Sequence, residues 1–541
     1  MAVSADPKVV VIIGCGIAGI TAAHRLIKAG FHVRILEATT RSGGRLKTGM
    51  LGNTITEIGA CYIHGASEEN PVFCLARDYG LLNPEALTEE NRAMDVGERP
   101  PWVPNWFSSS GQKLRAEQMN PAKEMFVELL KDISQVTNQE ETQWASIGHF
   151  IRSEAPKQAA ERWKDKNKTT RELLLCAIST MLKVECCDGA TNSMGDVDLV
   201  GYAAFKNLIG LDCTLPCGFE GLIEKLMSEL PSGSVSYNQP VRCVHWNDTG
   251  SGVNAVTVEC DDGERVAADH VIVTIPLGYL KKHHSTLFCP PLPANKLHSI
   301  QKLGFGTCNK IFVEFESPWW DPDCEIIYLL WEDEKDPSDQ VSDISKLWIR
   351  KMASFTVLPP SERNSHVLCG WIAGHESEYM ETLSGQEVRR SITELVRTFT
   401  GNPTITPRRI SCSRWFHDPW TCGSYSHAAV GSSAQDLENM MEPLPLKGSQ
   451  SQPLQVLFAG EATHPYHYST VHGALLSGRR EADRLIAHYS PTSSQVPASA
   501  LAGGFMFFCL YVHFSVSCQV AFALDFDYER KMIEGIKTPY L

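Results

Sequence analysis

Three glycines near the start of the chain have the spacing of a nucleotide-binding turn. Gly14, Gly16 and Gly19 form the pattern G-x-G-x-x-G directly after the apolar run 9–13 and before residues with helical periodicity. Backbone amides in the first turn of such a helix can donate hydrogen bonds to a pyrophosphate, and glycine leaves them uncovered. The pattern therefore predicts a strand, a tight turn and a helix that hold NAD, NADP or FAD.

An acidic residue narrows the choice among these dinucleotides. Glu37 ends the second apolar run, where its carboxylate can accept hydrogen bonds from both hydroxyls of a ribose. The same carboxylate would repel the 2′-phosphate of NADP. NAD and FAD remain as the two alternatives at this point.

The residues after Glu37 separate FAD from NAD. Arg41 and Arg45 flank Gly43 and Gly44 in the stretch ATTRSGGRLKT. Glycines permit close backbone approach, and guanidinium groups can neutralise phosphate oxygens. This pattern resembles the second fingerprint of the FAD-dependent amine oxidases. The resemblance implies FAD as the cofactor. It also implies an α/β fold in which a glutathione-reductase-like FAD-binding domain with a Rossmann-type βαβ unit is interleaved with an α+β substrate-binding domain.

Motifs near the other end of the chain resemble the same family. FAGEAT contains Gly460 and Glu461, which by this resemblance approach the phosphate and ribityl parts of FAD. In STVHGALLSG, Thr470 and Val471 begin a helix whose positive end would lie beneath the flavin ring. Val471 stands where close relatives have a threonine, and its backbone amide can serve the flavin equally well. Val241 matches the position that meets the adenine through its backbone.

Six further motifs are similar to the animal polyamine oxidases. They are, in chain order, EIGACYIHG, LKVECC, GLDCTLPCGFEGL, HVIVTIPLGYL, KLGFGTCNKIFVEFE and GSYSHAAVGSS. The resemblance is strongest to the N1-acetylpolyamine oxidases. It implies oxidation of the secondary amine of N1-acetylspermine or N1-acetylspermidine by FAD and O2, giving spermidine or putrescine, 3-acetamidopropanal and H2O2. Oxidation of spermine is the alternative reaction.

Two residues in these motifs are candidates for the catalytic centre. Removing a hydride equivalent from the carbon next to nitrogen requires a neutral amine and the exclusion of water. Lys310 matches the family lysine that holds a water near flavin N5; the alternative is a lysine whose ammonium reaches solvent. His64 matches the position that faces the substrate amine, where it can accept a hydrogen bond or help to deprotonate the nitrogen. A structural histidine is the alternative there.

Recognition of a linear polycation requires acidic side chains along an apolar tunnel. Glu185 in LKVECC is the candidate that pairs with a substrate ammonium, and an ordinary surface glutamate is the alternative. Tyr425 resembles the family aromatic residue that walls the flavin face. Asn309 is a neutral amide where spermine oxidases have an acid, which favours a substrate with an acetylated end.

One segment departs from the family pattern. Between DVDLVGYAAF and GLDC the chain is shorter than its relatives, and a tyrosine expected just before this segment has no clear counterpart, although Phe205 can replace part of it. This departure keeps open a hypothesis of another class, a flavin-binding or interaction protein with weak catalysis. A chromatin-type lysine demethylase is disfavoured, because the substrate region shows no long coiled-coil insertion.

These residues must be positioned by elements from both ends of the chain. The periodicity of residues 124–136 predicts an amphipathic helix, and the short alternating runs in residues 239–276 predict strands. A strand and an amphipathic helix are expected between residues 454 and 489. We expect an FAD-binding domain made from residues 1–90, 215–290 and 450–490, and a substrate-binding domain made from residues 91–214 and 291–449.

The composition fits a globular protein with more than one domain. The chain has 541 residues, 43% of them hydrophobic, and a net charge of -14, which disfavours nucleic acid as a partner and suits a cationic substrate. The 18 cysteines show no paired Cys-x-x-Cys spacing, so neither a metal site nor a disulfide framework is expected. The first strand begins near Lys8, which leaves no room for a secretory signal. We expect a monomer in a reduced compartment.

Residues 491–541 form an atypical tail. Within it, residues 500–524 are uncharged and long enough to span a bilayer at about 1.5 Å per residue. The alternative is that the tail is not part of the fold. The last residues, Pro539, Tyr540 and Leu541, lack the basic middle residue of a Ser-Lys-Leu peroxisomal signal. A peroxisomal location is therefore implied only by the relatives, and a cytoplasmic location is the alternative.

Overall fold

The fold is seen in a computed structural model, which describes residues 7–94, 102–138, 142–247, 255–358, 366–449 and 453–490. Residues 1–486 cluster into one compact unit and residues 487–541 into a second. Of the second unit, only residues 487–490 are described. The apolar segment 500–524 therefore lies outside the described residues, and no helix among those described is long and apolar enough to cross a membrane.

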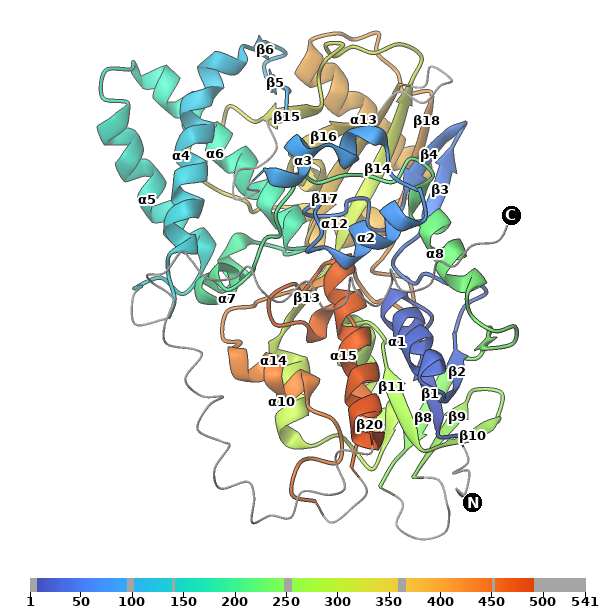
Figure 1. Cartoon of the computed structure of the whole chain (residues 1–541). Coiled ribbons are helices and arrows are strands. Elements are labelled where there is room, and N and C mark those ends of the chain that lie inside the picture. Colours follow the sequence, from blue (N-terminus) through green and yellow to red (C-terminus); the bar gives the residue numbers. More distant parts are fainter. Residues whose placement is uncertain are drawn as a thin grey trace, which may run out of the picture. The chain divides into compact units, whose positions relative to one another are not determined.

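A five-stranded parallel sheet is assembled from three separate segments of the chain (Figure 1). Its strands in spatial order are β20 (Val456–Phe458), β11 (His270–Val273), β1 (Val9–Ile13), β2 (His32–Leu36) and β7 (Val235–Ser236). Each neighbouring pair is parallel. Helix α1 (Ile17–Lys28) connects β1 to β2, as a parallel pair requires. The predicted α/β fold with a βαβ unit is confirmed.

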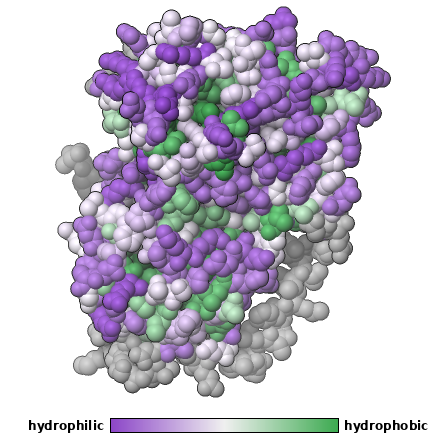
Figure 2. Space-filling view, turned by 180° about the vertical axis from the view of Figure 1, so that it is seen from behind, coloured by the Kyte–Doolittle hydropathy of each residue, from purple (hydrophilic) through white to green (hydrophobic). Residues whose placement is uncertain are grey.

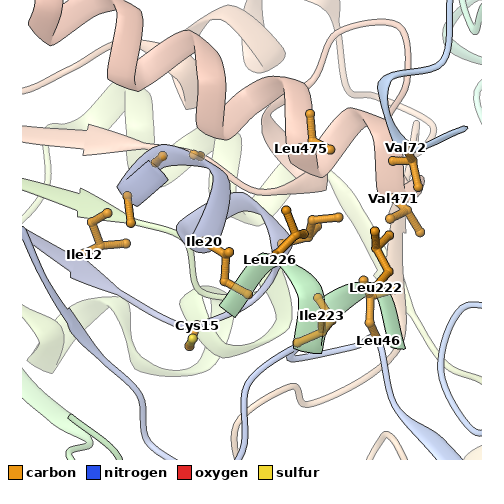
Figure 3. Close-up of a cluster of buried hydrophobic side chains, with 14 of the residues drawn as sticks. Ile12, Cys15, Ile20, Leu46, Val72, Leu222, Ile223, Leu226, Val471 and Leu475 are labelled. Carbon is orange, nitrogen blue, oxygen red and sulfur yellow. The ribbon is translucent and has the colours of Figure 1, made fainter. Parts of the chain in front are cut away.

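The two faces of this sheet bury alternate side chains of β1, because successive residues of a strand point to opposite faces. Val10 and Ile12 belong to one apolar cluster, and Val11 and Ile13 to another. The helices over the first face are α1, α2 (Pro71–Asp78), α8 (Gly218–Ser228) and α15 (Val471–Tyr489). Figure 3 shows this first cluster, with Leu475 of α15 above the side chains of α1 and α8.

The second face packs on a four-stranded sheet. Its order is β10 (Arg265–Ala268), β9 (Val256–Cys260), β8 (Val241–His245) and β12 (Phe288–Cys289). The strands predicted within residues 239–276 are therefore present. Three helices share this region: α9 (Leu277–Leu287), α10 (Ala294–Lys302) and α14 (Ala434–Met441).

A seven-stranded sheet lies in the other half of the unit (Figure 1). Its order is β18 (Arg409–Cys412), β14 (Cys308–Phe315), β17 (His366–Ala373), β16 (Ser354–Val357), β15 (Ile326–Leu330), β5 (Pro104–Ser108) and β6 (Lys113–Leu114). Only the β15 and β5 pair is parallel within it. Every residue of β14, the second strand in this order, is buried.

Helices cover both faces of this second sheet. One cluster contains α4 (Ala116–Ser134), α5 (Ile147–Arg162), α6 (Lys168–Asp188) and α7 (Leu199–Ala203). The other contains α11 (Ile344–Leu347), α12 (His375–Thr382) and α13 (Gly385–Thr400). The helix predicted from residues 124–136 is part of α4, which buries Met125, Phe126 and Leu129.

Short elements complete the described chain. They are helix α3 (Glu89–Ala93), the hairpin of β3 (Thr48–Leu51) with β4 (Thr54–Glu57), and the pair of β13 (Gly304–Gly306) with β19 (Tyr425–His427). The five-stranded sheet takes its strands from the segments predicted for the FAD-binding domain, and the seven-stranded sheet from those predicted for the substrate-binding domain. The division into domains stays a prediction, because residues 1–486 form one compact unit. On the face shown in Figure 2, most side chains are hydrophilic and the apolar ones form small separate areas.

Candidate active site

The turn between β1 and α1 is tightly packed at two glycines and open at the third. A Cβ at Gly14, where φ is 104°, would lie 2.7 Å from Thr274 Oγ1, and a Cβ at Gly19 would lie 2.1 Å from the Gly14 oxygen. At Gly16 the nearest heavy atom would be the Gly43 oxygen, 4.0 Å away. Gly16 is also the N-cap of α1 and has no side chain to accept from its first amides. The turn thus offers helix amides beside open space, as a phosphate requires.

The carboxylate of Glu37 is tied to this turn. Its Oε2 accepts a hydrogen bond from the backbone N–H of Cys15 at 2.8 Å, and its Oε1 accepts from the N–H and the hydroxyl of Thr39 at 2.9 and 2.7 Å. A carboxylate has about four acceptor positions. These three bonds leave capacity for a further donor such as a ribose hydroxyl.

Val241 lies near Glu37 at the start of β8. The residues just before it pair with the end of β2, where the N–H of Gln239 donates to the Glu37 oxygen and the N–H of Asn238 donates to the Thr39 oxygen, both at 2.9 Å. The pairing of β8 with β9 is irregular between Val241 and Cys243. The structure therefore brings the residue predicted to meet the adenine close to the residue predicted to hold the ribose.

The two arginines of the second motif have different surroundings. Arg41 donates to the carbonyls of Ser42 and Leu46 at 3.1 Å each and to the Gly44 carbonyl, and burial lowers its pKa. Its guanidinium braces the glycine loop through these bonds, and the predicted phosphate contact stays a prediction. Arg45 instead donates from Nη1 to Glu461 Oε1 at 2.8 Å.

Glu461 joins three segments at this place. It is 5% exposed. Besides the bond from Arg45, which lies 416 residues away in sequence, its Oε2 accepts from the Ser426 hydroxyl at 2.6 Å and from the Ser469 N–H at 2.7 Å. Ser469 has a φ of 65°, a backbone conformation that is energetically unfavourable for a residue other than glycine. Glu461 therefore stabilises the strained backbone of Ser469, two residues before α15 begins. The adjacent Gly460 has a φ of 116°.

The start of α15 is capped by Thr470. Its hydroxyl accepts from the Gly473 N–H at 3.0 Å and donates to the His467 carbonyl at 2.7 Å. The hydroxyl of Thr470 is therefore committed to the helix. The N–H groups that α15 can offer a ligand are those of its first turn, beginning at Val471, where the positive end of the helix dipole favours negative charge.

Lys310 is buried in the middle of β14. Its side chain is 5% exposed, so the alternative of a surface lysine is wrong. The ammonium donates to the carbonyls of Glu57 at 2.9 Å and Gly59 at 2.5 Å, and lies 4.6 Å from the centre of the Trp371 ring. Trp415 Nε1 donates to the intervening Ile58 carbonyl at 3.2 Å. These bonds fix the segment that leads to His64.

His64 forms a pair with an aspartate. Its Nδ1 lies 2.7 Å from Asp212 Oδ2, and the N–H of Gly65 donates to Asp212 Oδ1 at 3.1 Å. The His64 side chain is 51% exposed. Desolvation by the surrounding protein lowers the pKa of His64, but the hydrogen bond and the charge of Asp212 outweigh it, and the net pKa is raised. The ring therefore keeps one nitrogen accessible while the other is held.

Glu185 lies near the end of α6, and Tyr425 contacts the same end of this helix. Glu185 is 2% exposed, so the alternative of a surface glutamate is wrong; the Tyr202 hydroxyl lies 3.5 Å from its Oε2. Two residues further along the helix, the Cys187 carbonyl accepts from the Tyr425 hydroxyl at 2.5 Å. Burial raises the pKa of Tyr425 well above its ordinary value. Tyr425 is thus held at the end of α6, two residues along the helix from Glu185.

Comparisons with known proteins now decide the family. Residues 17–486 match the family described as flavin containing amine oxidoreductase. The chain belongs to this family. It is 44% identical over 491 residues to the peroxisomal N(1)-acetyl-spermine/spermidine oxidase of Bos taurus, covering 89% of this chain and 95% of the relative. The enzyme of the same name from Homo sapiens is 44% identical over 497 residues, covering 90% and 96%.

A solved structure supports the same fold. The structure of a putrescine oxidase double mutant with redesigned cofactor binding matches with a TM-score of 0.59 at 19% identity, covering 89% of this chain and 99% of that one. The cofactor of this flavin amine oxidoreductase is FAD. The open space at Gly16 lies beside the free N–H groups in the first turn of α1, which can donate to a pyrophosphate. The first turn of α15 can likewise favour the negative charge of a reduced flavin.

The structure does not support a direct substrate contact for Asn309. The residue is fully buried. Its Nδ2 donates to Ser377 Oγ at 2.9 Å and Glu381 Oε1 at 2.6 Å, and its Oδ1 accepts from the Ser413 hydroxyl at 2.8 Å and the Trp415 N–H at 3.2 Å. These four bonds use every donor and acceptor of the amide. Because neighbours in a strand point to opposite faces, Asn309 faces away from the side of β14 that Lys310 occupies.

Sequence reasoning missed two partners of the predicted catalytic residues. Asp212 lies within the quoted motif GLDCTLPCGFEGL, but its pairing with His64 spans 148 residues. Trp371 pairs with Lys310 in the register of β17 against β14. The pairing of β14 with β17 brings Lys310 and Trp371 together, and the return of the segment after α7 brings Asp212 to His64. In the part of the chain that the structure describes, no group of three or more His, Cys, Asp or Glu residues could hold a metal ion.

Proposed function

We propose that this enzyme oxidises the secondary amine of N1-acetylspermine and N1-acetylspermidine. With O2 and water, the reaction gives spermidine or putrescine, 3-acetamidopropanal and H2O2. The observation that supports it most strongly is the 44% identity to two oxidases named for these substrates, over 95% and 96% of their lengths. The family supports FAD-dependent oxidation of polyamines, and the names of the two relatives support the acetylated substrates.

The described residues can perform the tasks this reaction sets. When bound, FAD supplies the acceptor for the two electrons and the hydrogen of the amine carbon, and passes the electrons to O2. His64, half exposed and paired with Asp212, can accept a hydrogen bond or proton from the reacting nitrogen, which must be neutral. The buried ammonium of Lys310 can hold a water in place near the reacting centre.

We assign substrate binding to Glu185 and Tyr425. Glu185 stands at a position that, by the family resemblance, lies beside the substrate, and a carboxylate attracts a cation. Glu185, buried near the end of α6, is therefore proposed to pair with an ammonium of the polyamine remote from the reacting nitrogen. Tyr425, held by the Cys187 carbonyl, is proposed to wall the site and exclude water.

Spermine is the second candidate substrate. The one sequence argument against it was the neutral side chain of Asn309, and that side chain is fully buried among protein partners. The preference for an acetylated end therefore rests on the relatives alone, and both substrates must be tested together.

The test uses the purified full-length chain with its FAD. Flavin absorbance near 450 nm is recorded under anaerobic conditions while N1-acetylspermine or spermine is added, and H2O2 is then measured in air. Faster flavin reduction by N1-acetylspermine supports the proposal, and faster reduction by spermine makes the enzyme a spermine oxidase. A flavin reduced by neither would support the hypothesis of a flavin-binding protein with weak catalysis.

We also propose a peroxisomal location, because both relatives are named as peroxisomal oxidases. The test compares the full chain with a variant ending at Ser490, each imaged in cells with a peroxisomal marker. Co-localisation of the full chain with the marker supports the proposal, and a diffuse or membrane-wide signal refutes it.

A further inference from the structure

Asp212 contacts the segment of His64 through both of its carboxylate oxygens. Asp212 makes two hydrogen bonds to consecutive residues, with Oδ2 to the His64 ring at 2.7 Å and with Oδ1 to the Gly65 N–H at 3.1 Å. A backbone N–H can only donate, so Oδ1 must be an acceptor oxygen. The second bond therefore fixes which way the Asp212 side chain is turned.

The backbone around the pair is held on both sides. Ile63 and Cys213 exchange N–H to O bonds at 2.8 and 3.1 Å, in an antiparallel bridge. Asn70 donates from Nδ2 to the His64 carbonyl at 2.7 Å. Gly65 has a φ of 74°, and a Cβ there would lie 2.6 Å from Leu208 Cβ. The segment around Asp212 and the segment of His64 are thus held to each other, and among the described residues His64 Nδ1 has Asp212 as its hydrogen-bond partner.

An ionised carboxylate accepts and cannot donate. The Nδ1 atom of His64 must therefore carry the proton that it shares with Asp212. In a neutral imidazole the other nitrogen is then an acceptor. Nε2 of His64 accordingly presents a lone pair, which is what a reacting amine with an N–H or an extra proton requires.

We infer that Asp212 is a positioning residue that fixes the tautomer of His64, so that Nε2 is the acceptor for the substrate amine. This inference rests on the proposed function, since it assigns His64 to the amine. Asp212 itself touches neither substrate nor cofactor in this assignment; it acts through the ring.

The other groups near His64 decide how its charge responds to pH. Asp188 at the end of α6 contributes a negative charge that raises the pKa of His64, as Asp212 does. His472 of α15 is close enough for His64 to affect its pKa, and burial keeps His472 neutral by lowering its pKa to about 2. Tyr62 is also near, with its ring centre 6.1 Å from that of His64. Of these groups, Asp212 lies at hydrogen-bond distance from the ring, 2.7 Å from Nδ1.

The informative substitution is Asp212→Asn. The Gly65 N–H still requires an oxygen, so the new amide is forced to turn its NH2 group toward His64. The NH2 group would donate to Nδ1, and the proton would move to Nε2, which could then no longer accept from the amine. The size and shape of the side chain are almost unchanged, and the bond to Gly65 is kept, so the protein is expected to fold and bind FAD.

The first measurement does not depend on activity. Diethyl pyrocarbonate modifies neutral imidazole, and the peptide that contains His64 is followed by mass spectrometry across pH in the FAD-loaded protein. The inference predicts that the pH midpoint for His64 is lower in Asp212→Asn than in the wild type, because the negative charge is gone. The control is Glu378→Gln, which removes a carboxylate 3.1 Å from His375 Nδ1 and should leave the His64 midpoint unchanged.

The second measurement is a double-mutant cycle on kcat/KM with a polyamine. Asp212→Asn alone is expected to lower kcat/KM by about 100-fold, at the low end of what general acid–base catalysis contributes. In a His64→Gln background, Asp212→Asn should change kcat/KM by less than about twofold, because the residue acts only through the ring.

The outcomes separate this inference from the proposed function. A lower His64 midpoint together with a non-additive cycle supports it. An unchanged midpoint, or an equal loss of kcat/KM in both His64 backgrounds, overturns it and shows a merely structural role. If the midpoint falls but the wild type oxidises no polyamine, the proposed function fails and the assignment of Nε2 to an amine fails with it, while the pairing of the two side chains stands.

Discussion

Replacing Lys310 with methionine tests whether the buried ammonium serves the reaction or only the fold. The ammonium donates to the carbonyls of Glu57 and Gly59 and lies over the Trp371 ring. Methionine has a similar length but no N–H, so both carbonyls lose this donor and the aromatic ring loses its cation. Two effects are therefore expected, one on stability and one on catalysis.

The structural effect can be estimated from the contacts. A buried carbonyl that loses its donor costs about 1–3 kcal/mol, so the two together cost about 2–6 kcal/mol. Methionine offsets part of this loss, because burying it requires no desolvation of a charge. We expect the free energy of unfolding to fall by about 2–4 kcal/mol.

Lys296 of α10 is a matched control for this structural effect. It is fully buried, donates to the carbonyls of Asn439 at 2.6 Å and Met440 at 3.1 Å, and lies 4.0 Å from the centre of the Phe458 ring. Lys296→Met therefore removes the same set of interactions at a place to which we assign no step of the reaction. We expect it to destabilise the protein by a similar amount and to change kcat/KM by less than about threefold.

The assay combines urea unfolding, flavin absorbance and rapid kinetics. Lys310→Met is expected to keep FAD but to lower kcat/KM by about 100-fold or more, measured as the rate of anaerobic flavin reduction and of reoxidation by O2. Equal losses of activity in Lys310→Met and Lys296→Met would refute a special role for Lys310. If Lys310→Met has the same midpoint of urea unfolding as the wild type, the hydrogen bonds of Lys310 do not stabilise the fold as we expect.

Three further predictions follow from the described contacts. Gly19→Ala places a Cβ 2.1 Å from a backbone oxygen and should yield protein without absorbance near 450 nm, whereas Gly385→Ala, at a position with open space, should keep its flavin. Glu185→Gln should raise KM for polyamines by about 30-fold, equivalent to about 2 kcal/mol, in steady-state peroxide assays; an unchanged KM would contradict its proposed role. Burial lowers the pKa of His427 and His464 to about 4 and that of His472 to about 2, so these three residues let the unfolded chain bind up to three more protons as the pH falls from about 6.5 to 4. They should lower stability in urea by up to about 4.1 kcal/mol per pH unit, and His472→Gln should remove about a third of this contribution.

Local backbone features were predictable because glycine reports them directly. The turn at Gly14 has the positive φ and the close packing that its motif predicts, and the strands and the helix of the βαβ unit follow it. The same holds at Gly460, where φ is 116°. Backbone that must adopt such conformations leaves few residue choices, so the sequence carries a strong signal there.

Side-chain partners were less predictable, for two physical reasons. A charged group takes whichever acceptor the fold brings near, and for Arg41 the nearest acceptors are carbonyls of its own loop. His64 and Asp212 lie 148 residues apart in sequence, and they meet only because the segment after α7 returns to the loop before α2. Neither arrangement leaves a periodicity that could be read in advance.

Asn309 shows why the direction of a side chain in β14 could not be read from the pattern. In a half-exposed strand the alternation of polar and apolar residues marks the two faces, but all eight residues of β14 are buried. The amide of Asn309 hydrogen-bonds to Glu381 and Ser413, and its oxygen also accepts from the Trp415 N–H. The Trp415 ring and the Lys310 ammonium in turn donate to the carbonyls of residues 57–59. An acid at this position would place a second carboxylate 2.6 Å from Glu381, which like charges oppose. Any effect of such an exchange on substrate choice must therefore act through the placement of Trp415 and Lys310, and not through contact with the substrate.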